Sequence, residues 1–237
     1  MIQFFLLLSF SSLIQDDPQI IHMAGIEFKV VQNGESGRRF IWLHGDEQTA
    51  RMALERHIKT NKGKAFLVTS IVREIDFFGG IIDPNRIFSS DGAKANIQKY
   101  NRKWSRSKKK ETLEIINSDR PEFLSQILPK NGGLLVALHN NFKGYNVKKE
   151  IHKSENISIK KDQNPRDFFI CTNRNDFNIL AKSPFNVVLQ ETLPKKDDGS
   201  LSWAAIRHGV RYVNIETRLG WLSQQTKMLN YIEKNLP

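Results

Sequence analysis

Residues 40–47 read Phe-Ile-Trp-Leu-His-Gly-Asp-Glu, an apolar run that ends directly in polar residues. Four consecutive apolar residues are typical of a strand that is covered on both faces of a sheet. A second run of this kind, residues 134–138, ends directly in His139. Because α/β sheets place their binding sites at the carboxyl ends of strands, the stretch predicts a buried strand that presents His44 and Glu47 at such an edge.

Further apolar runs alternate with stretches of helical spacing along the chain. Besides residues 40–43, strands are expected over residues 28–31, 65–72, 134–138, 168–172, 186–189 and 212–215. Helices are expected over residues 46–60, 91–118, 121–128 and 221–234. The turn residues Asn, Gly and Ser between 28–31 and 40–43 predict that these two strands form a hairpin. The alternation predicts an α/β domain with a mixed, mostly parallel sheet and helices on both faces.

Composition restricts the class of protein. The chain has 237 residues, with 36 Lys and Arg against 25 Asp and Glu, which gives a net charge of +11. A hydrophobic fraction of 39% with 26% charged residues excludes a disordered chain and a multi-span membrane protein. The only cysteine is Cys171, so an internal disulfide and a thiolate metal cluster are excluded. A bound metal would therefore be held by His, Asp and Glu.

The N-terminus has its own character. Residues 2–14 are almost entirely apolar or small, and charge begins at Asp16. The run is too short for a transmembrane helix of about 20 residues, but it fits the apolar region of a secretory signal peptide. We therefore expect a leader over residues 1–22 and one domain over 23–237, with no transmembrane segment, in a secreted or periplasmic protein. Because no basic residue precedes the run and no Ala-x-Ala site follows it, a start at Met23 and a cytoplasmic location is the alternative.

Six of the positive charges lie in residues 102–110, Arg-Lys-Trp-Ser-Arg-Ser-Lys-Lys-Lys. A basic run with a tryptophan can bind nucleic acid or another anionic surface. The commoner alternative is a solvated helix face or loop, and no recognised nucleic-acid module surrounds the run. We expect no specific nucleic-acid partner.

The strand ends indicate a metal site. His44 and Glu47 lie three residues apart, where a strand gives way to a helix, so an imidazole and a carboxylate can converge on one cation. His139 ends another predicted strand and would supply a third ligand. Two histidines and one glutamate, with water in the fourth position, form a known catalytic zinc arrangement. A bare His-x-x-Glu also occurs by chance, as a buried histidine beside a helix-capping glutamate, but two strands that end in histidine favour the metal site.

Further motifs follow in a recognisable order. Asp83-Pro-Asn-Arg-Ile-Phe88 lies between the two ligand segments, and Arg73-Glu-Ile-Asp76 precedes it. Later, Arg211-Tyr-Val-Asn-Ile215 reads as a strand that ends in Glu216, just before the last helix. Together these motifs resemble the zinc carboxypeptidase superfamily, and their residues are most similar to those of its succinylglutamate desuccinylase/aspartoacylase branch. The resemblance covers roughly residues 38–233.

The resemblance implies a zinc carboxypeptidase-like α/β fold, of the phosphorylase/hydrolase-like type, and roles for individual residues. His44, Glu47 and His139 would bind one Zn²⁺ ion. Glu216 would be the general base that takes a proton from the metal-activated water and returns it to the leaving nitrogen. Glu191, which also follows an apolar strand, is a rival, but Glu216 has the right place before the closing helix.

The resemblance also implies how substrate is held. Arg86, with Asn85, would clamp a substrate carboxylate, because the planar guanidinium binds both oxygens; the alternative is a surface ion pair between Arg86 and Asp83. Arg73 would polarise the scissile carbonyl. Asn140 would hydrogen-bond substrate or, alternatively, support the neighbouring ligand.

The implied function is a zinc-dependent metallohydrolase that cleaves an amide bond next to a carboxylate, as a carboxypeptidase does. Its substrate would be a small peptide, a cell-wall peptide or an acyl-amino acid with a free carboxylate. The alternatives are an N-acyl amino acid deacylase of the desuccinylase/aspartoacylase type, and a non-catalytic module that binds anionic polymer through its basic face. The substrate-binding tyrosine of the peptidases has no motif here, and Tyr145 and Tyr212 are the candidates.

Overall fold

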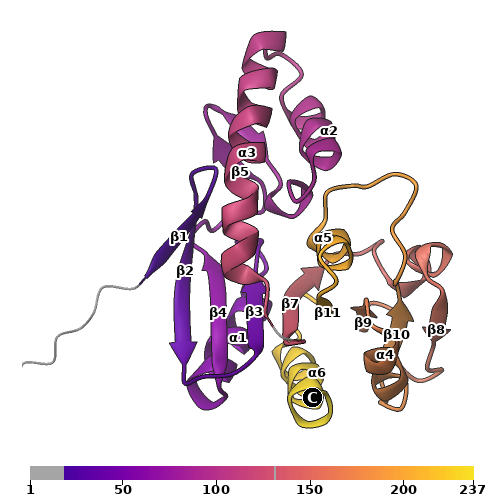
Figure 1. The fold of residues 1–237 in the computed structure, drawn as a ribbon. Coiled ribbons are helices and arrows are strands. Elements are labelled where there is room, and N and C mark those ends of the chain that lie inside the picture. Colours follow the sequence, from indigo (N-terminus) through magenta and orange to yellow (C-terminus); the bar gives the residue numbers. More distant parts are fainter. Residues whose placement is uncertain (1–18, 131) are drawn as a thin grey trace, which may run out of the picture.

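The computed structural model describes residues 19–130 and 132–237, and its centre is one nine-stranded sheet in the order β1-β2-β4-β3-β7-β11-β9-β10-β8 (Figure 1). The middle of the sheet is a block of four mutually parallel strands: β4 (Gly63–Val68), β3 (Arg38–Trp42), β7 (Leu134–Asn141) and β11 (Arg211–Arg218). Strands on either side add the antiparallel pairings: β1 (Ile20–Met23), β2 (Ile26–Asn33), β9 (Phe168–Cys171), β10 (Asn186–Leu189) and β8 (Asn156–Ser158). β10 runs parallel to β9. The predicted α/β class with a mixed sheet is confirmed.

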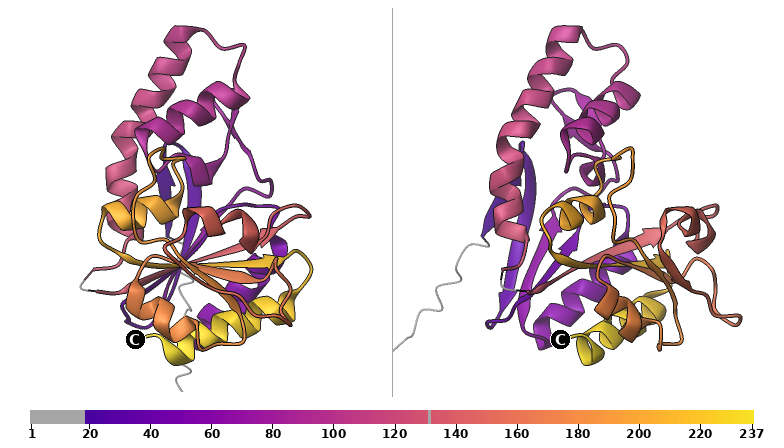
Figure 2. Two further views of the ribbon diagram at one scale, coloured as in Figure 1. Left: turned by 90° about the vertical axis from the view of Figure 1, so that its right-hand side faces the viewer. Right: turned by 45° about the vertical axis from the view of Figure 1, so that its right-hand side comes forward.

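Helices cover both faces of the sheet (Figure 2). α1 (Gln48–Thr60) and α6 (Leu222–Asn235) pack against each other on one face. On the other face lie α5 (Leu201–Arg207) and the C-terminal part of α3 (Arg106–Ile127). α4 (Arg174–Leu180) packs beside β9 and β10. This double cover explains why β3 and β7 are apolar along both faces.

The central strands are buried over most of their length. Every residue of β7 is buried, and Phe40–Leu43 are at most 1% exposed. α1 adds an apolar side that contains Ala50, Ala53 and Leu54, and His57 lies among them at 5% exposure. His57 is thus a core histidine, as its place on the apolar side of the helix predicts.

The predicted hairpin between residues 28–31 and 40–43 is wrong. β4 lies between the two strands, antiparallel to β2 and parallel to β3. A strand with no polar face is best buried in the centre of a sheet, with a neighbour on each side. β3 has such a place between β4 and β7, and this burial outweighs the turn-forming residues that precede it.

The helices between residues 90 and 127 also differ from expectation. The single helix expected over 91–118 is two helices, α2 (Ser90–Tyr100) and α3, and α3 continues through Pro121 to Ile127. The break follows Asn101, whose side chain donates to the carbonyl of Ile81 (2.7 Å) and accepts from its N–H (2.8 Å). Ile81 belongs to a two-stranded ribbon of β5 (Ile75–Phe77) and β6 (Gly80–Ile82). The ribbon therefore fixes the end of α2 through contacts distant in sequence.

This ribbon, α2 and the first half of α3 project beyond the sheet (Figure 1). The basic run 102–110 covers the break between the two helices and the start of α3. Residues 1–18 of the expected leader lie outside the described residues, and Ile20–His22 form part of β1. Among the described residues, no helix combines the length and the apolar character needed to span a membrane.

Candidate metal centre

A tight turn at the end of β3 places His44 and Glu47. The N–H of Gly45 donates to the carbonyl of Val72 (3.0 Å), and the N–H of Glu47 donates to the carbonyl of His44 (3.1 Å). A Cβ on Gly45 would lie 2.2 Å from the carbonyl oxygen of Ser70, so only glycine fits here. The turn therefore rests directly on the backbone of residues 70–72, and it leads into α1 immediately after Glu47.

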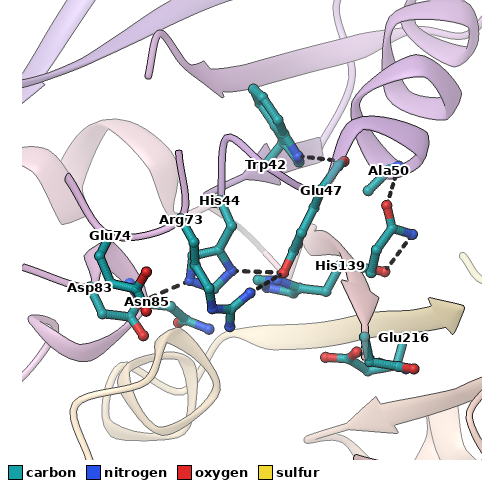
Figure 3. A network of polar contacts seen from close by, with 12 residues as sticks. Trp42, His44, Glu47, Ala50, Arg73, Glu74, Asp83, Asn85, His139 and Glu216 are labelled. Carbon is teal, nitrogen blue, oxygen red and sulfur yellow. Dashed lines mark hydrogen bonds and ion pairs between the residues drawn. The ribbon is translucent and has the colours of Figure 1, made fainter. Parts of the chain in front are cut away.

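The Glu47 carboxylate lies between two histidine rings (Figure 3). Its Oε1 is 2.9 Å from His44 Nδ1, and its Oε2 is 2.9 Å from His139 Nδ1. The three side chains are 1% to 4% exposed. Their potential ligand atoms all lie within 4.8 Å of one another, so the group could hold a metal ion. The structure thus brings together the three residues that the strand ends single out.

The donor set fits a zinc ion. Two imidazole nitrogens and a carboxylate are donors that zinc prefers, and catalytic zinc sites commonly use three such ligands. His44 turns its Nδ1 toward Glu47 while its Nε2 lies 2.9 Å from Asp83 Oδ1. A carboxylate on the second nitrogen is the usual way in which a metal-binding histidine is oriented. The Nε2 of His139 is buried and has no hydrogen-bond partner in the described part of the chain.

The electrostatics of the cluster favour a cation. Burial alone would raise the pKa of the Glu47 carboxyl. His139 and His44 outweigh this effect through their charge and their hydrogen bonds, and they hold the pKa well below its usual range. Burial would lower the pKa of His44, but Glu47 and Asp83 raise it to about 9. A positive charge at His44, whether a proton or a metal, therefore stabilises two buried carboxylates.

Glu216 lies next to this cluster because of strand register. β11 and β7 are parallel, with Glu216 opposite His139. The carboxylate accepts hydrogen bonds from the side-chain amides of Asn141 (3.2 Å) and Asn214 (3.1 Å) and is 7% exposed. Burial, opposed by His139 and reinforced by the charge of Glu47, raises the pKa of Glu216. A carboxyl with a raised pKa suits proton exchange near neutral pH.

The residues named from the sequence line one cavity of about 260 Å³: His44, Glu47, Arg73, Asn85, Arg86, His139, Asn140 and Glu216. Glu191, the rival of Glu216, does not line it and forms an ion pair with Arg174 instead. The cavity is therefore where any function of these residues would be carried out.

Arg86 and Asn85 hold different positions at the cavity. The side chain of Arg86 is 37% exposed, its Nη1 donates to the carbonyl of Asn85 (2.7 Å), and its nearest carboxylate is Asp198 at 4.0 Å. The expected rival pairing with Asp83 is not formed, because Asp83 contacts His44. The Asn85 side chain accepts from the N–H of Leu201 (3.0 Å) and so fixes the start of α5.

Arg73 and Asn140 both contact protein groups around the ligands. Arg73 Nη1 donates to Glu47 Oε1 at 2.7 Å. The Asn140 oxygen accepts from the hydroxyl of Thr49 (2.6 Å) and from the N–H of Ala50 (2.9 Å) at the start of α1. Its nitrogen donates to side chains of β11 and α6. In this structure Asn140 therefore supports the helix that follows Glu47, while a direct role with substrate stays a prediction.

Several functional candidates have no clear signal in the sequence. Asp83 stands in the Asp-Pro-Asn-Arg motif, but the motif does not say that it contacts His44. Asn214 alternates with Glu216 along β11, so period-two spacing could have placed both on one face. Glu150 and Gln190 line the cavity from separate loops, and no local pattern connects them.

Comparisons with known proteins give distant structural likenesses. No family model and no curated protein matches the chain. The ectoine utilization protein EutE (DoeB) from Ruegeria pomeroyi is 14% identical at a TM-score of 0.45, over 87% of this chain and 59% of that one. A succinylglutamate desuccinylase/aspartoacylase from Rhodobacter sphaeroides is 15% identical at a TM-score of 0.47, and the match covers 88% of this chain and 57% of that one. A succinylglutamate desuccinylase from Silicibacter sp. is 17% identical at a TM-score of 0.44, and the match covers 88% of this chain and 60% of that one.

The chain thus spans less than two thirds of the length of these solved structures. Likenesses at this level assign no activity to this chain. Two of these structures carry the name succinylglutamate desuccinylase, one of them together with aspartoacylase.

Proposed function

We propose that the protein is a zinc-dependent hydrolase that cleaves an amide bond next to a carboxylate. The observation that carries the proposal is the buried group of His44, Glu47 and His139 in the same cavity as Glu216 and Arg86. His44 and His139 would hold the ion through Nδ1, and Glu47 through its carboxylate. When bound, zinc would supply a Lewis acid and a water acidified to a pKa of about 7.

The proton chemistry would be carried by Glu216. Its carboxylate would accept a proton from the attacking water as the carbon–oxygen bond forms. It would then pass that proton to the amide nitrogen as the carbon–nitrogen bond breaks, which leaves a carboxylic acid and an amine. The raised pKa of Glu216 supports this exchange, and Asn141 and Asn214 hold the carboxylate in place.

Substrate orientation would come from Arg86. Its guanidinium is partly exposed to the cavity, and a planar fork binds both oxygens of a carboxylate. The substrate class is therefore a peptide with a free C-terminus, including a cell-wall peptide, or an N-acyl amino acid. The cavity volume of about 260 Å³ is slightly below the usual range of ligand pockets, which starts at ~300 Å³. We therefore expect a small substrate, with one amino-acid-sized group inside the cavity.

Metal content and hydrolysis test the proposal together. Elemental analysis should find one zinc ion per chain in the wild type and in Glu216→Gln, and much less in His139→Ala. His152→Ala removes an exposed histidine and serves as the matched control. Against a panel of short peptides and N-acyl amino acids, Glu216→Gln should lower kcat by about 10²–10⁴-fold.

Two results would contradict it. A wild-type chain that takes up no zinc when zinc is supplied would remove the metal centre. A zinc-loaded chain that hydrolyses neither the peptides nor the N-acyl amino acids of the panel would favour a non-catalytic module that binds anionic polymer.

A further inference from the structure

One buried carboxylate on the cavity, Glu150, has no part in the proposed reaction. Its side chain is 6% exposed, between the short helical turns Val147–Lys149 and Ile151–Lys153. A buried carboxylate is costly unless it is hydrogen-bonded and paired with a cation. The partners of Glu150 therefore indicate what this end of the cavity is built to bind.

Two uncharged donors fix the carboxylate. Gln190, 1% exposed after β10, donates from Nε2 to Glu150 Oε2 at 2.8 Å. The Tyr145 hydroxyl donates to Oε1 at 3.1 Å, and the Tyr145 ring packs against Phe168 with centroids 5.7 Å apart. These donors orient the carboxylate, and its negative charge remains to be balanced.

The cation that balances the charge is Lys153. Its Nζ lies 3.3 and 3.4 Å from the two carboxylate oxygens, and its side chain is 39% exposed. Contacts of this length from a flexible, half-exposed side chain are weak, because solvent competes for the ammonium. Lys153 can therefore turn out to solvent and leave its position to another cation.

Glu150 and Lys153 line the same cavity as Glu216, the residue proposed to carry the proton. Tyr145, whose hydroxyl donates to Glu150, lines this cavity as well. Arg86 lines the same cavity and would hold the carboxylate of a substrate.

We infer that Glu150 is a specificity residue, and that it selects substrates whose side chain ends in a primary ammonium or a guanidinium. This inference rests on the proposed function for the identity of the reacting bond. The cationic end of the substrate would replace the ammonium of Lys153 on the Glu150 carboxylate. The favoured substrate carries a free carboxylate at one end and a cationic side chain at the other.

Binding of free amino acids tests the inference without hydrolysis. L-lysine and L-norleucine differ in the terminal ammonium, and both carry the α-amino and α-carboxyl groups. Calorimetry with the zinc-supplemented wild type should show a Kd for lysine at least about tenfold lower than the Kd for norleucine. Glu150→Gln keeps the shape of the side chain and should abolish the difference. Asp162→Asn removes an exposed carboxylate that does not line the cavity, and it should leave the difference unchanged.

A second variant covers the case in which Glu150→Gln does not fold. Lys153→Met removes the internal competitor on a half-exposed side chain, and it should raise the affinity for lysine severalfold while leaving norleucine unaffected. Equal affinity of the wild type for lysine and norleucine would overturn the inference, even if amides are hydrolysed. A preference that survives in Glu150→Gln, or that Lys153→Met weakens, would overturn it as well.

The two proposals fail separately. If the chain prefers lysine but cleaves neither peptides nor acyl-amino acids, the hydrolase function is wrong and the cation site stands. If it cleaves neutral or acidic substrates best, the hydrolase stands and the role of Glu150 is wrong.

Discussion

At the scale of residues, the sequence identifies the members of the candidate metal site but not the residues that support them. His44 and His139 each follow an apolar run without a gap, so their place at a strand end can be predicted from the chain alone. The Asp83 contact that orients His44 depends on the path of residues 73–83, for which the sequence predicts neither a helix nor a strand. The same holds for Asn141, which lies beside a predicted ligand yet holds Glu216.

Asp83 should be needed for metal affinity although it is not among the expected ligands. Its carboxylate lies 2.9 Å from His44 Nε2, and loss of such a partner typically costs 10–100-fold in metal affinity. We expect Asp83→Ala to weaken zinc binding by about this factor, as measured by competition with a chelating dye. Asp76→Ala, which removes an exposed carboxylate on β5, is the control, and an equal loss in both variants would contradict a specific role.

At the scale of elements, patterns within one segment are predicted well and pairings between segments are not. β10 (Asn186–Leu189) lies where its apolar run predicts, and α1 begins two residues after the predicted start at residue 46. The hairpin fails because β4 takes the place beside β2. The short elements β5, β6, β8, α4 and α5 lack long periodic stretches, so their existence depends on contacts elsewhere.

The turn between β3 and α1 should not tolerate a side chain at Gly45. A Cβ there would lie 2.2 Å from the carbonyl oxygen of Ser70, a backbone atom that cannot move aside alone. Overpacking of this kind typically costs about 1–3 kcal/mol, and Gly45→Ala should lower the free energy of unfolding by that amount and weaken zinc binding. Urea denaturation measures the first effect.

Gly37→Ala provides the comparison, because the nearest atom to its added Cβ is at an ordinary 3.4 Å. A Gly45→Ala variant as stable as Gly37→Ala would show that the backbone of residues 70–72 is not packed on this turn.

At the scale of the whole molecule, the site joins segments that span the described chain. His44 precedes α1, His139 lies near the end of β7 and Glu216 lies on the last strand, so the candidate site forms only when the central sheet is assembled. The sequence predicts the class of this sheet, because apolar strands alternate with helices. It does not predict the strand order, because that order depends on contacts between segments far apart in the chain.

Zinc should therefore stabilise the whole domain. A ligand that binds only the folded state adds about 2.7 kcal/mol at a concentration of 100 Kd, and each kcal/mol raises Tm by roughly 2–4 °C in a chain of this size. Differential scanning calorimetry should show this rise for the wild type and little for His139→Ala. An unchanged Tm in the wild type would contradict specific binding.

The rise in Tm should depend on pH. The proton on His44 stabilises the metal-free fold fully below the ordinary pKa of 6.5, and that stabilisation is lost as the pH rises through about 9. Since the same imidazole must be deprotonated to bind metal, the rise produced by zinc should be larger at pH 9 than at pH 6. A larger rise at pH 6 would contradict metal binding through His44.

The pairing of Glu216 with His139 across two parallel strands has a consequence for how such a protein can change. Their separation is set by the backbone ladder between β7 and β11, whereas Glu150 and Tyr145 lie in the connection that follows β7. Loops accept substitution and insertion more readily than the strands they join. If the proposed roles hold, the proton-transfer residue and the specificity residue lie in separate segments, so exchanging residues 142–155 should change the preferred substrate side chain without moving Glu216 relative to His139.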